Sequence, residues 1–478
     1  MAFWLSGLRS GLRGIRAKVR LTPYDTSTEA GRGAERYRRA ALTAIASAAA
    51  RIVSLATVLL TVPITLSYLG AERYGVVVTI TALTAMLVFA DFGLGNGLMN
   101  LVAAAKGRDD QRAVRVSVSS AFFMLTGVAA VLAIPSYMLY RFVPWTSFMN
   151  VGPEHADEVS TAVAIFLASV LVNLPLGIVH RVQLALQEGF VNSLWNAIGS
   201  IASIAGVLLA VQLRGDLSWI VLALVGGPVV ANSLNWLWLF LVRHRDFRPR
   251  WSAATVSDGR RLARIGALFF VLQLSVAFAY QSDVVVATRV IGPQAATDYS
   301  VTFRLFMIVP TIVNMVLLPL WPAYSEALAR GDGRWVLRTL RLSVLTALVA
   351  SGFSSLVLIA FGSTILNLWV GSRVVASVPL LLGMGAWAVL SNVSTAVAML
   401  LNGASVMRLQ VATAITMAIA SPVASIVLGR AFGVAGIIWG TVIAQALCTA
   451  IPTAFFLSGF VRRLDRLRAV QHNRPTVA

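Results

Sequence analysis

Long apolar runs separated by short polar breaks fill the chain between about residues 40 and 460. Each run has roughly 20 to 28 residues, and about 20 apolar residues cross the hydrocarbon core of a bilayer as an α-helix. Strands of a membrane barrel would instead alternate polar and apolar residues over about ten positions. The pattern therefore predicts an all-α integral membrane protein with about twelve transmembrane helices. These spans are expected, to within a few residues, at 42–68, 74–102, 114–140, 159–180, 190–212, 217–241, 264–290, 299–325, 340–368, 375–401, 409–429 and 434–460.

The composition agrees with this class. Hydrophobic residues make up 58% of the 478 residues, charged residues 12%, and the mean hydropathy is +0.80, whereas soluble proteins have roughly 25% charged residues. The single cysteine, Cys448, excludes a disulfide framework. The four histidines are scattered and form no ligand cluster in the sequence. We therefore expect no metal site, no cofactor and no catalytic residue.

The distribution of basic residues predicts the orientation in the membrane. The net charge is +20, which alone would suggest a nucleic-acid partner. However, about 31 of the 39 Lys and Arg residues lie at the two ends and in the even-numbered loops, against about 6 in the other loops. By the positive-inside rule both termini are cytoplasmic, and no nucleic-acid partner is expected.

The basic connections also predict the domain organisation. We expect a basic cytoplasmic N-terminal segment at 1–39, a six-helix lobe at 40–242, a basic cytoplasmic linker at 243–263, a second six-helix lobe at 264–460 and a basic cytoplasmic tail at 461–478. Within the first segment, residues 1–20 have an apolar helical stripe flanked by arginines, which fits a helix lying on the anionic leaflet. A solvated basic tail is the alternative. Residues 21–39 are expected to be a linker, because they contain several Pro, Ser and Gly residues.

The two halves of the chain resemble one another with a repeat of about 225 residues. Leu69-Gly70 followed by Tyr74 matches Ile291-Gly292 followed by Tyr299, and residues 105–109 match 329–333. With six spans in each half, equivalent helices run in the same direction. This indicates a parallel repeat about an axis along the membrane normal, which commonly places a substrate path between the halves.

Several short motifs resemble those of a known family. They are Leu69-Gly70 with Arg73-Tyr74-Gly75, the stretch Asp91-Phe92-Gly93-Leu94-Gly95-Asn96-Gly97, Gln281-Ser282-Asp283 leading to Tyr299, and LWPAYSEALA within residues 319–329. In these motifs the chain resembles the polysaccharide exporters and O-antigen flippases of the multidrug/oligosaccharidyl-lipid/polysaccharide superfamily. The resemblance implies two pseudo-symmetric six-helix lobes around a central cavity lined by helices 1, 2, 7 and 8. It also implies transport of a lipid-linked oligosaccharide across the bacterial inner membrane by alternating access.

Four ionisable residues are predicted at membrane depth, namely Arg51, Asp91, Asp283 and Arg304. Such side chains cost at least about 2.5–3.5 kcal/mol on insertion scales, so they are functional candidates. Arg51 and Asp91 are each about 20 residues from one predicted turn, and Asp283 and Arg304 about 10 from another, which implies equal depth within each pair. We expect two ion pairs. In one interpretation the arginines bind an anionic substrate and the aspartates pair with them or bind a coupling ion; in the other, the pairs only brace their hairpins.

Uncharged polar residues within the predicted spans are weaker candidates for lining a cavity, because Asn and Gln often only join helices. They are Gln273, Gln281, Asn314, Asn173 and Asn96.

Three classes of function remain for such a chain: a membrane enzyme that polymerises or ligates glycans, an ion-coupled exporter of cationic drugs and a flippase for lipid-linked glycans. A membrane enzyme usually needs a large extracytoplasmic loop, but the longest one predicted, residues 141–158, is short. An exporter of cationic drugs should have an acidic cavity without arginine. The arginines favour a flippase for an anionic lipid-linked (polyprenyl-diphosphate) oligosaccharide or polysaccharide repeat unit. The ion-coupled drug exporter is the alternative, H⁺ or Na⁺ are candidate coupling ions, and no enzymatic activity is expected.

The expected location is the bacterial inner membrane, in multi-pass form. The expected partners are the lipid-linked glycan, membrane lipids, and polysaccharide polymerase and glycosyltransferase machinery.

Topology reporters test this orientation. Reporters fused after Arg108, Arg250 and Arg334 should give cytoplasmic signals, because these sites follow basic connections. Reporters fused after Glu154 and Gly371 should give extracytoplasmic signals. An extracytoplasmic signal after Arg250 would contradict the arrangement of six spans on either side of the linker.

Overall fold

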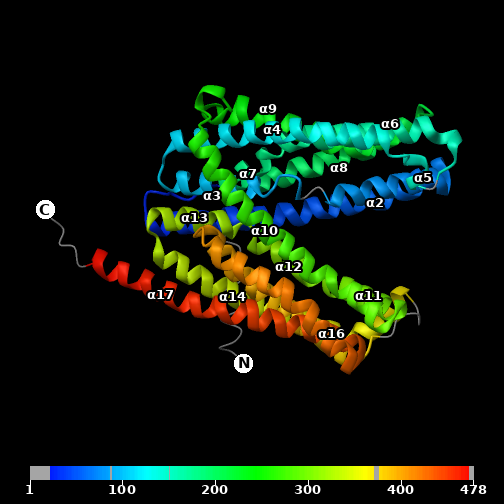
Figure 1. Ribbon diagram of the computed structural model, residues 1–478. Helices are drawn as coiled ribbons and strands as arrows, with labels where there is room; N and C mark the ends of the chain where they lie inside the picture. Colours follow the sequence, from blue (N-terminus) through cyan, green and yellow to red (C-terminus); the bar gives the residue numbers. More distant parts are fainter. Residues whose placement is uncertain (1–21, 87–88, 150, 371–375, 473–478) are drawn as a thin grey trace. The chain divides into compact units, whose positions relative to one another are not determined.

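The computed structural model describes residues 22–86, 89–149, 151–370 and 376–472 (Figure 1). Regular structure within these ranges is helical, and they contain no strand. Ten helical segments are long and apolar enough to cross a membrane. One of them, Met407–Arg462, has 56 residues and would extend about 84 Å, more than twice a bilayer core. Gly433 interrupts it with non-helical angles (φ 63°, ψ −148°), so this segment supplies two spans.

Another span follows the first helix of the structure. Helix α2 (Glu29–Met86) is interrupted at Gly70, and its second part, together with α3 (Leu94–Gly107), forms the predicted second span. With this span, of which residues 87 and 88 lie outside the described ranges, and with the division at Gly433, the helices account for twelve crossings. The predicted all-α membrane fold is therefore confirmed.

The chain forms two compact units, Met1–Ala267 and Leu268–Ala478. In unit 1, α8 packs against both α2 and α9, and α6 packs against α4 and α9. Its core includes Val76, Phe166, Val207 and Leu217. After α2 and α3, the helices of this unit are α4 (Gln111–Phe142), α5 (Trp145–Met149), α6 (Ala156–Leu176), α7 (Ile178–Ala185), α8 (Gly189–Gln212), α9 (Leu217–Leu237) and the start of α10 (Val256–Val286).

In unit 2, α15 packs against α13, α14 and α16. Its core gathers large side chains that include Tyr299, Phe306, Met384 and Trp387. The helices that follow α10 are α11 (Pro293–Phe306), α12 (Ile308–Leu317), α13 (Leu320–Arg330), α14 (Gly333–Val370), α15 (Val378–Gly403), α16 (Met407–Gln445) and α17 (Ile451–His472). Helix α17 thus continues past residue 460, where the last span was expected to end.

The same glycine turn occurs at matching positions of the sequence repeat. Gly70 has φ 76° and ψ 168°, and Gly292 has φ 134° and ψ 172°. Residues with a Cβ rarely adopt such positive φ values. The turn between the first two helices of each half therefore depends on glycine, which explains why Leu-Gly and Ile-Gly recur in the two halves.

The predicted linker at 21–39 is wrong from Glu29 onward, because α2 begins there. Thr28 caps the helix through a hydrogen bond of 3.0 Å from the Gly31 backbone N–H to its side-chain oxygen. The buried carboxylate of Glu35 then receives hydrogen bonds from Arg38 (2.7 Å) and Arg39 (2.8 Å). These interactions outweigh the low helix propensity of the two glycines in the first turns. The predicted surface helix at 1–20 lies outside the described residues.

Large apolar side chains remain exposed along the long helices. Ile52 and Leu59 on α2, Val131 on α4 and Phe353 on α14 are each at least 68% exposed. Exposed apolar area of this extent is unfavourable in water and favourable against lipid tails. The faces that carry these residues are consistent with contact with the bilayer.

Candidate functional site

The second span is broken in the middle of the Asp91–Gly97 motif. Phe92 and Gly93 have positive φ values of 48° and 72°, and α3 begins at Leu94. The Asp91 carboxylate accepts hydrogen bonds from the backbone N–H groups of Gly93 (2.8 Å) and Gly95 (3.3 Å). These donors at the start of a helix have no partner within it, and the positive end of the helix dipole stabilises an anion there. Asp91 is therefore held in place by the helix break.

Arg181 on α7 completes this arrangement. Its guanidinium donates a hydrogen bond to the side-chain oxygen of Asn96 (2.8 Å), and its Nη2 lies 3.8 Å from Oδ2 of Asp91. A Cβ at position 95 would lie 2.7 Å from both Arg181 Nε and Asp91 Oδ2, so a larger residue there would force one of these side chains to move. The side chains of Arg181 and Asp91 remain 31% and 20% exposed. The pair is consequently partly accessible rather than sealed in the core.

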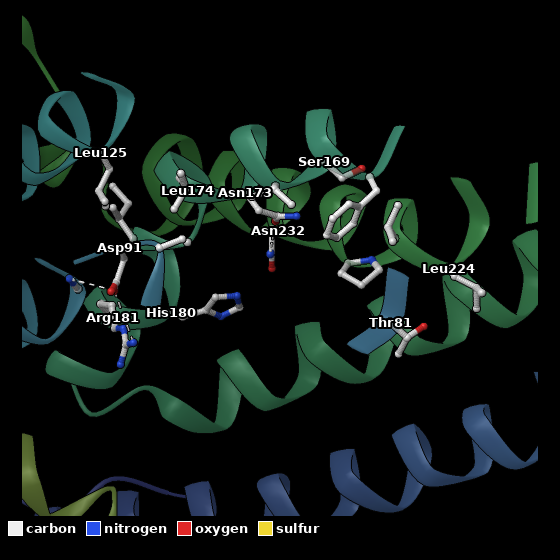
Figure 2. Close-up of a pocket in the computed structure, with 18 residues that line it drawn as sticks. Thr81, Asp91, Leu125, Ser169, Asn173, Leu174, His180, Arg181, Leu224 and Asn232 are labelled. Atoms are coloured by element: carbon white, nitrogen blue, oxygen red, sulfur yellow. Dashed lines mark hydrogen bonds and ion pairs between the residues drawn. The ribbon is translucent and has the colours of Figure 1, made fainter. Parts of the chain in front are cut away.

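This pair borders a cavity of about 790 Å³ inside unit 1. Figure 2 shows Asp91 and Arg181 toward one end of the cavity, Asn173 and Asn232 near its middle, and Thr81 toward the other end. Its polar lining residues are Thr81, Asp91, Ser169, Asn173, His180, Arg181 and Asn232, and the apolar ones include Leu125, Phe166, Val170, Leu174, Ile178, Leu224, Val225 and Pro228.

Hydrogen bonds between helices fix the polar side of the cavity. Asn232 on α9 donates a hydrogen bond of 2.9 Å to Asn173 on α6, and His180 Nδ1 contacts the side-chain oxygen of Asn192 on α8. Behind them, the amides of Gln183 on α7 and Asn235 on α9 exchange two hydrogen bonds of 2.7 and 3.1 Å. Helix α7 is thereby held so that His180 and Arg181 both reach the cavity. A mostly apolar cavity with a few fixed polar groups is typical of a ligand-binding site.

A different polar centre lies in unit 2. The Asp283 side chain on α10 is fully buried and accepts hydrogen bonds from three hydroxyl groups, those of Tyr299 (2.6 Å), Thr441 (2.6 Å) and Ser425 (3.0 Å). These donors lie on α11 and on the two parts of α16. Among the described residues, no Arg, Lys or His forms an ion pair with Asp283. Its charge is thus stabilised by neutral donors alone.

The two predicted ion pairs are wrong. Asp91 lies beside Arg181 instead of Arg51, and Asp283 is surrounded by hydroxyl groups instead of Arg304. Both Arg51 and Arg304 are exposed, and neither forms an ion pair within the described ranges. For the second pair the reason is helical geometry: Arg304 follows Tyr299 by five residues, a rotation of about 140° away from the side that meets Asp283.

The weaker candidates are divided. Asn96 is buried and holds Arg181, and Asn173 lines the cavity of unit 1. Gln273 and Asn314 are half-buried and Gln281 is exposed. None of these last three lines the cavity of unit 1 or the cavity beside Leu380 and Trp439 in unit 2.

Sequence reasoning missed Arg181 and His180 as site residues. The predicted fourth span ended at residue 180, which placed Arg181 in a cytoplasmic loop. In the structure the chain continues through Gly177 into α7, which ends only at Ala185. The polar residues Asn173, His180 and Gln183 are spaced by seven and three residues, which places them on one side of a helix. That spacing could have indicated that the polar face continues past residue 180.

The sequence matches one family model and is similar to two bacterial proteins. The family model described as "Polysaccharide biosynthesis protein" matches residues 43–328. A Salmonella typhimurium protein named as an O-antigen transporter is 24% identical over 269 residues, which are 55% of this chain and 59% of that protein. A Yersinia pseudotuberculosis protein named as an O-antigen export protein is 24% identical over 293 residues, 58% of this chain and 63% of that protein. The match thus spans about three fifths of each relative.

Structure comparison gives similar folds. A crystal structure of MATE in the bent conformation has a TM-score of 0.76 and 13% identity, and the match covers 91% of this chain and 97% of that one. A transporter of the MOP superfamily from Pyrococcus furiosus has a TM-score of 0.72 and 13% identity, with 90% and 96% covered. At this identity the similarity shows a shared fold and no more.

The contact between Asp91 and Arg181 can be tested by thermal unfolding of the purified protein in detergent. Arg181→Met should lower the free energy of unfolding by about 1–3 kcal/mol, because a partly buried carboxylate loses its cation. Adding Asp91→Asn to that variant should recover most of the loss, since the amide oxygen can still accept from Gly93. Arg51→Met is the control and should melt like the parent protein. If Arg181→Met also melts like the parent, the pair does not stabilise unit 1.

Proposed function

We propose a function from the premise that the chain belongs to the polysaccharide biosynthesis protein family, as its sequence motifs indicated and the family match confirms. It moves a lipid-linked oligosaccharide or polysaccharide repeat unit across the bacterial inner membrane by alternating access. The names of the two relatives, an O-antigen transporter and an O-antigen export protein, support a glycan as the cargo. The MATE neighbours support a transporter fold.

This proposal rests on the charge that remains available to a ligand, which is positive. Of the four residues singled out at membrane depth, the two carboxylates are satisfied by protein donors and the two arginines, Arg51 and Arg304, are exposed. Arg304 follows the Gly292 turn by 12 residues, so it lies about 18 Å along the helix, near the middle of a core of about 30 Å. A guanidinium at this depth is unfavourable unless it meets water or an anion.

An anionic head group fits these arginines. Guanidinium carries a fixed positive charge and a fork of N–H donors that matches the oxygens of a phosphate. A diphosphate joined to a lipid would therefore bind Arg51 and Arg304, at different stages of transport. The cavity of unit 1 offers amide, hydroxyl and imidazole groups suited to sugar hydroxyls, with Arg181 at one end. A cationic drug would be repelled by these arginines.

Asp283 is our candidate for the coupling site. A carboxylate buried in a membrane span without a basic partner is costly while it is charged, and a bound proton or sodium ion removes that charge. The three hydroxyl groups could turn their oxygens toward Na⁺ or keep their protons on the carboxylate. Asp91 is less suited, because Arg181 and two backbone N–H groups already compensate its charge.

Export can be tested in a strain that lacks the gene. The parent protein should restore surface polysaccharide and prevent lipid-linked oligosaccharide from accumulating on the cytoplasmic leaflet. Arg51→Ala and Arg304→Ala should each reduce export at least about tenfold. Their abundance should be normal, because neither side chain forms an ion pair with another described residue. The lysine variants should restore export partly, because they keep the charge and lose the fork.

Arg141→Ala, at an exposed arginine near the outer end of α4, is the matched control and should export normally. Full export by both alanine variants would remove the binding role. Unchanged glycan in the deletion strain, together with new sensitivity to cationic drugs, would instead identify a drug exporter.

The coupling role is tested in vesicles with an imposed proton or sodium gradient. Asp283→Asn removes the ionisable group and keeps a side chain of the same size, so transport should lose its dependence on the gradient. Thr441→Val removes one hydroxyl and should weaken that dependence without abolishing it. Asp91→Asn is the comparison and should retain it. An Asp283→Asn protein that still responds to the gradient as the parent does would show that this carboxylate is only structural.

A further inference from the structure

The basic linker that follows α9 is folded onto the cytoplasmic half of α4. Arg115 of α4 donates a hydrogen bond of 2.6 Å to the carbonyl oxygen of Asp246. Further along, the backbone N–H groups of Arg250 and Thr255 donate to the buried hydroxyls of Ser119 (3.1 Å) and Ser120 (3.3 Å). The linker is therefore a fixed surface of unit 1 and not a free loop.

Side-chain packing extends this attachment. The ring of Trp251 packs edge-on against Phe123 of α4, with centroids 4.7 Å apart. At the start of α10, a methyl group added to Gly259 would meet the Met124 sulfur at 3.4 Å. The path of the linker from 246 to 259 thus follows α4 from Arg115 to Met124.

The length of α4 gives the depth of this surface. The helix has 32 residues, about 48 Å, whereas a bilayer core is about 30 Å thick. If the core ends near Phe142 on the far side, about 20 residues of α4 cross it, which places the cytoplasmic boundary near Phe123. The linker then lies in the head-group layer, with Trp251 at the boundary, where tryptophan is favoured.

The charges of this surface have no partners of their own. Arg248, Arg250, Arg260 and Arg261 are exposed, and none of them forms an ion pair within the described ranges. Arg243 differs, because it is paired with the buried carboxylate of Glu188 (3.3 Å). The only acidic residues between 245 and 261 are Asp246 and Asp258, and Asp258 accepts a hydrogen bond from Thr255 (2.7 Å).

Exposed apolar groups lie among these arginines. Trp251 is 76% exposed and Val256 is 73% exposed. A soluble acidic partner would be recognised by the charges alone, and it would leave these two side chains without a function. Cations at head-group depth beside exposed apolar side chains fit the anionic face of a bilayer, where the apolar groups enter the acyl boundary.

We propose that Arg248, Arg250, Trp251, Arg260 and Arg261 form a binding surface for anionic phospholipid head groups of the cytoplasmic leaflet. The surface is separate from the proposed transport function, since it takes a bilayer lipid and not the cargo. It lies on unit 1, at residues 248–261, before the chain enters unit 2 at residue 268. Bound lipid would therefore stabilise the attachment of the linker to α4.

The test uses the full-length protein, stripped of lipid in a neutral detergent. Phosphatidylglycerol should bind and raise the melting temperature, and added salt should weaken that binding, whereas phosphatidylcholine should do neither. Replacing all four arginines with glutamine should lower phosphatidylglycerol affinity at least about a hundredfold, because each basic residue contributes about fivefold. Affinity is measured by lipid retention in native mass spectrometry, and size-exclusion chromatography confirms folding.

Two further variants make the result specific. Arg141→Gln with Arg214→Gln changes exposed arginines outside the linker and should leave the affinity unchanged. Trp251→Ala should weaken phosphatidylglycerol binding and not the binding of soluble glycerol phosphate, which has no acyl boundary. The proposal is overturned if the four-arginine variant retains phosphatidylglycerol within twofold of the parent, or if phosphatidylcholine stabilises the protein equally.

Discussion

The need to satisfy backbone polar groups inside a membrane governs the polar site of unit 1. Where the second span breaks at Phe92 and Gly93, the first N–H groups of α3 lose their helical partners, and in lipid no water replaces them. Asp91 supplies the acceptor, but its charge then needs a cation, which Arg181 provides. Glycine at residue 95 leaves space for the Arg181 side chain beside Asp91. One broken helix thus accounts for the carboxylate, the arginine and the glycine.

How far the sequence predicts this structure depends on the range of the interaction. Spans follow from local hydrophobicity, and the turns at Gly70 and Gly292 follow from backbone sterics, so both could be predicted. Contacts between side chains on different helices could not be predicted. Equal counts from a turn give equal depth, yet depth does not say which side of a helix faces its neighbour. The break at Phe92 further altered the register on which the pair of Arg51 with Asp91 depended.

The two units use one fold for different electrostatics. In unit 1 a carboxylate is balanced by an arginine and remains partly open to a cavity. In unit 2 a carboxylate is enclosed by three hydroxyls and has no exposed surface. An open ion pair can exchange a partner for an arriving anion, whereas a carboxylate without exposed surface offers no such access. The two halves are therefore similar in their backbone turns and differ in the partners of their carboxylates.

The arginines of this protein can be sorted by whether the fold itself uses them. Arg38, Arg39, Arg181 and Arg243 each have a carboxylate partner, so a structural role is sufficient to explain them. Arg248, Arg250, Arg260 and Arg261 of the linker form no ion pair within the described ranges, but at head-group depth water and lipid phosphates stabilise their charges at little cost. Neither a carboxylate partner nor head-group depth explains Arg304, because it lies about 18 Å along its helix. Within the described ranges it has no ion-pair partner, so its charge is tolerated only where water or an anionic ligand reaches the exposed face of α11 that carries it.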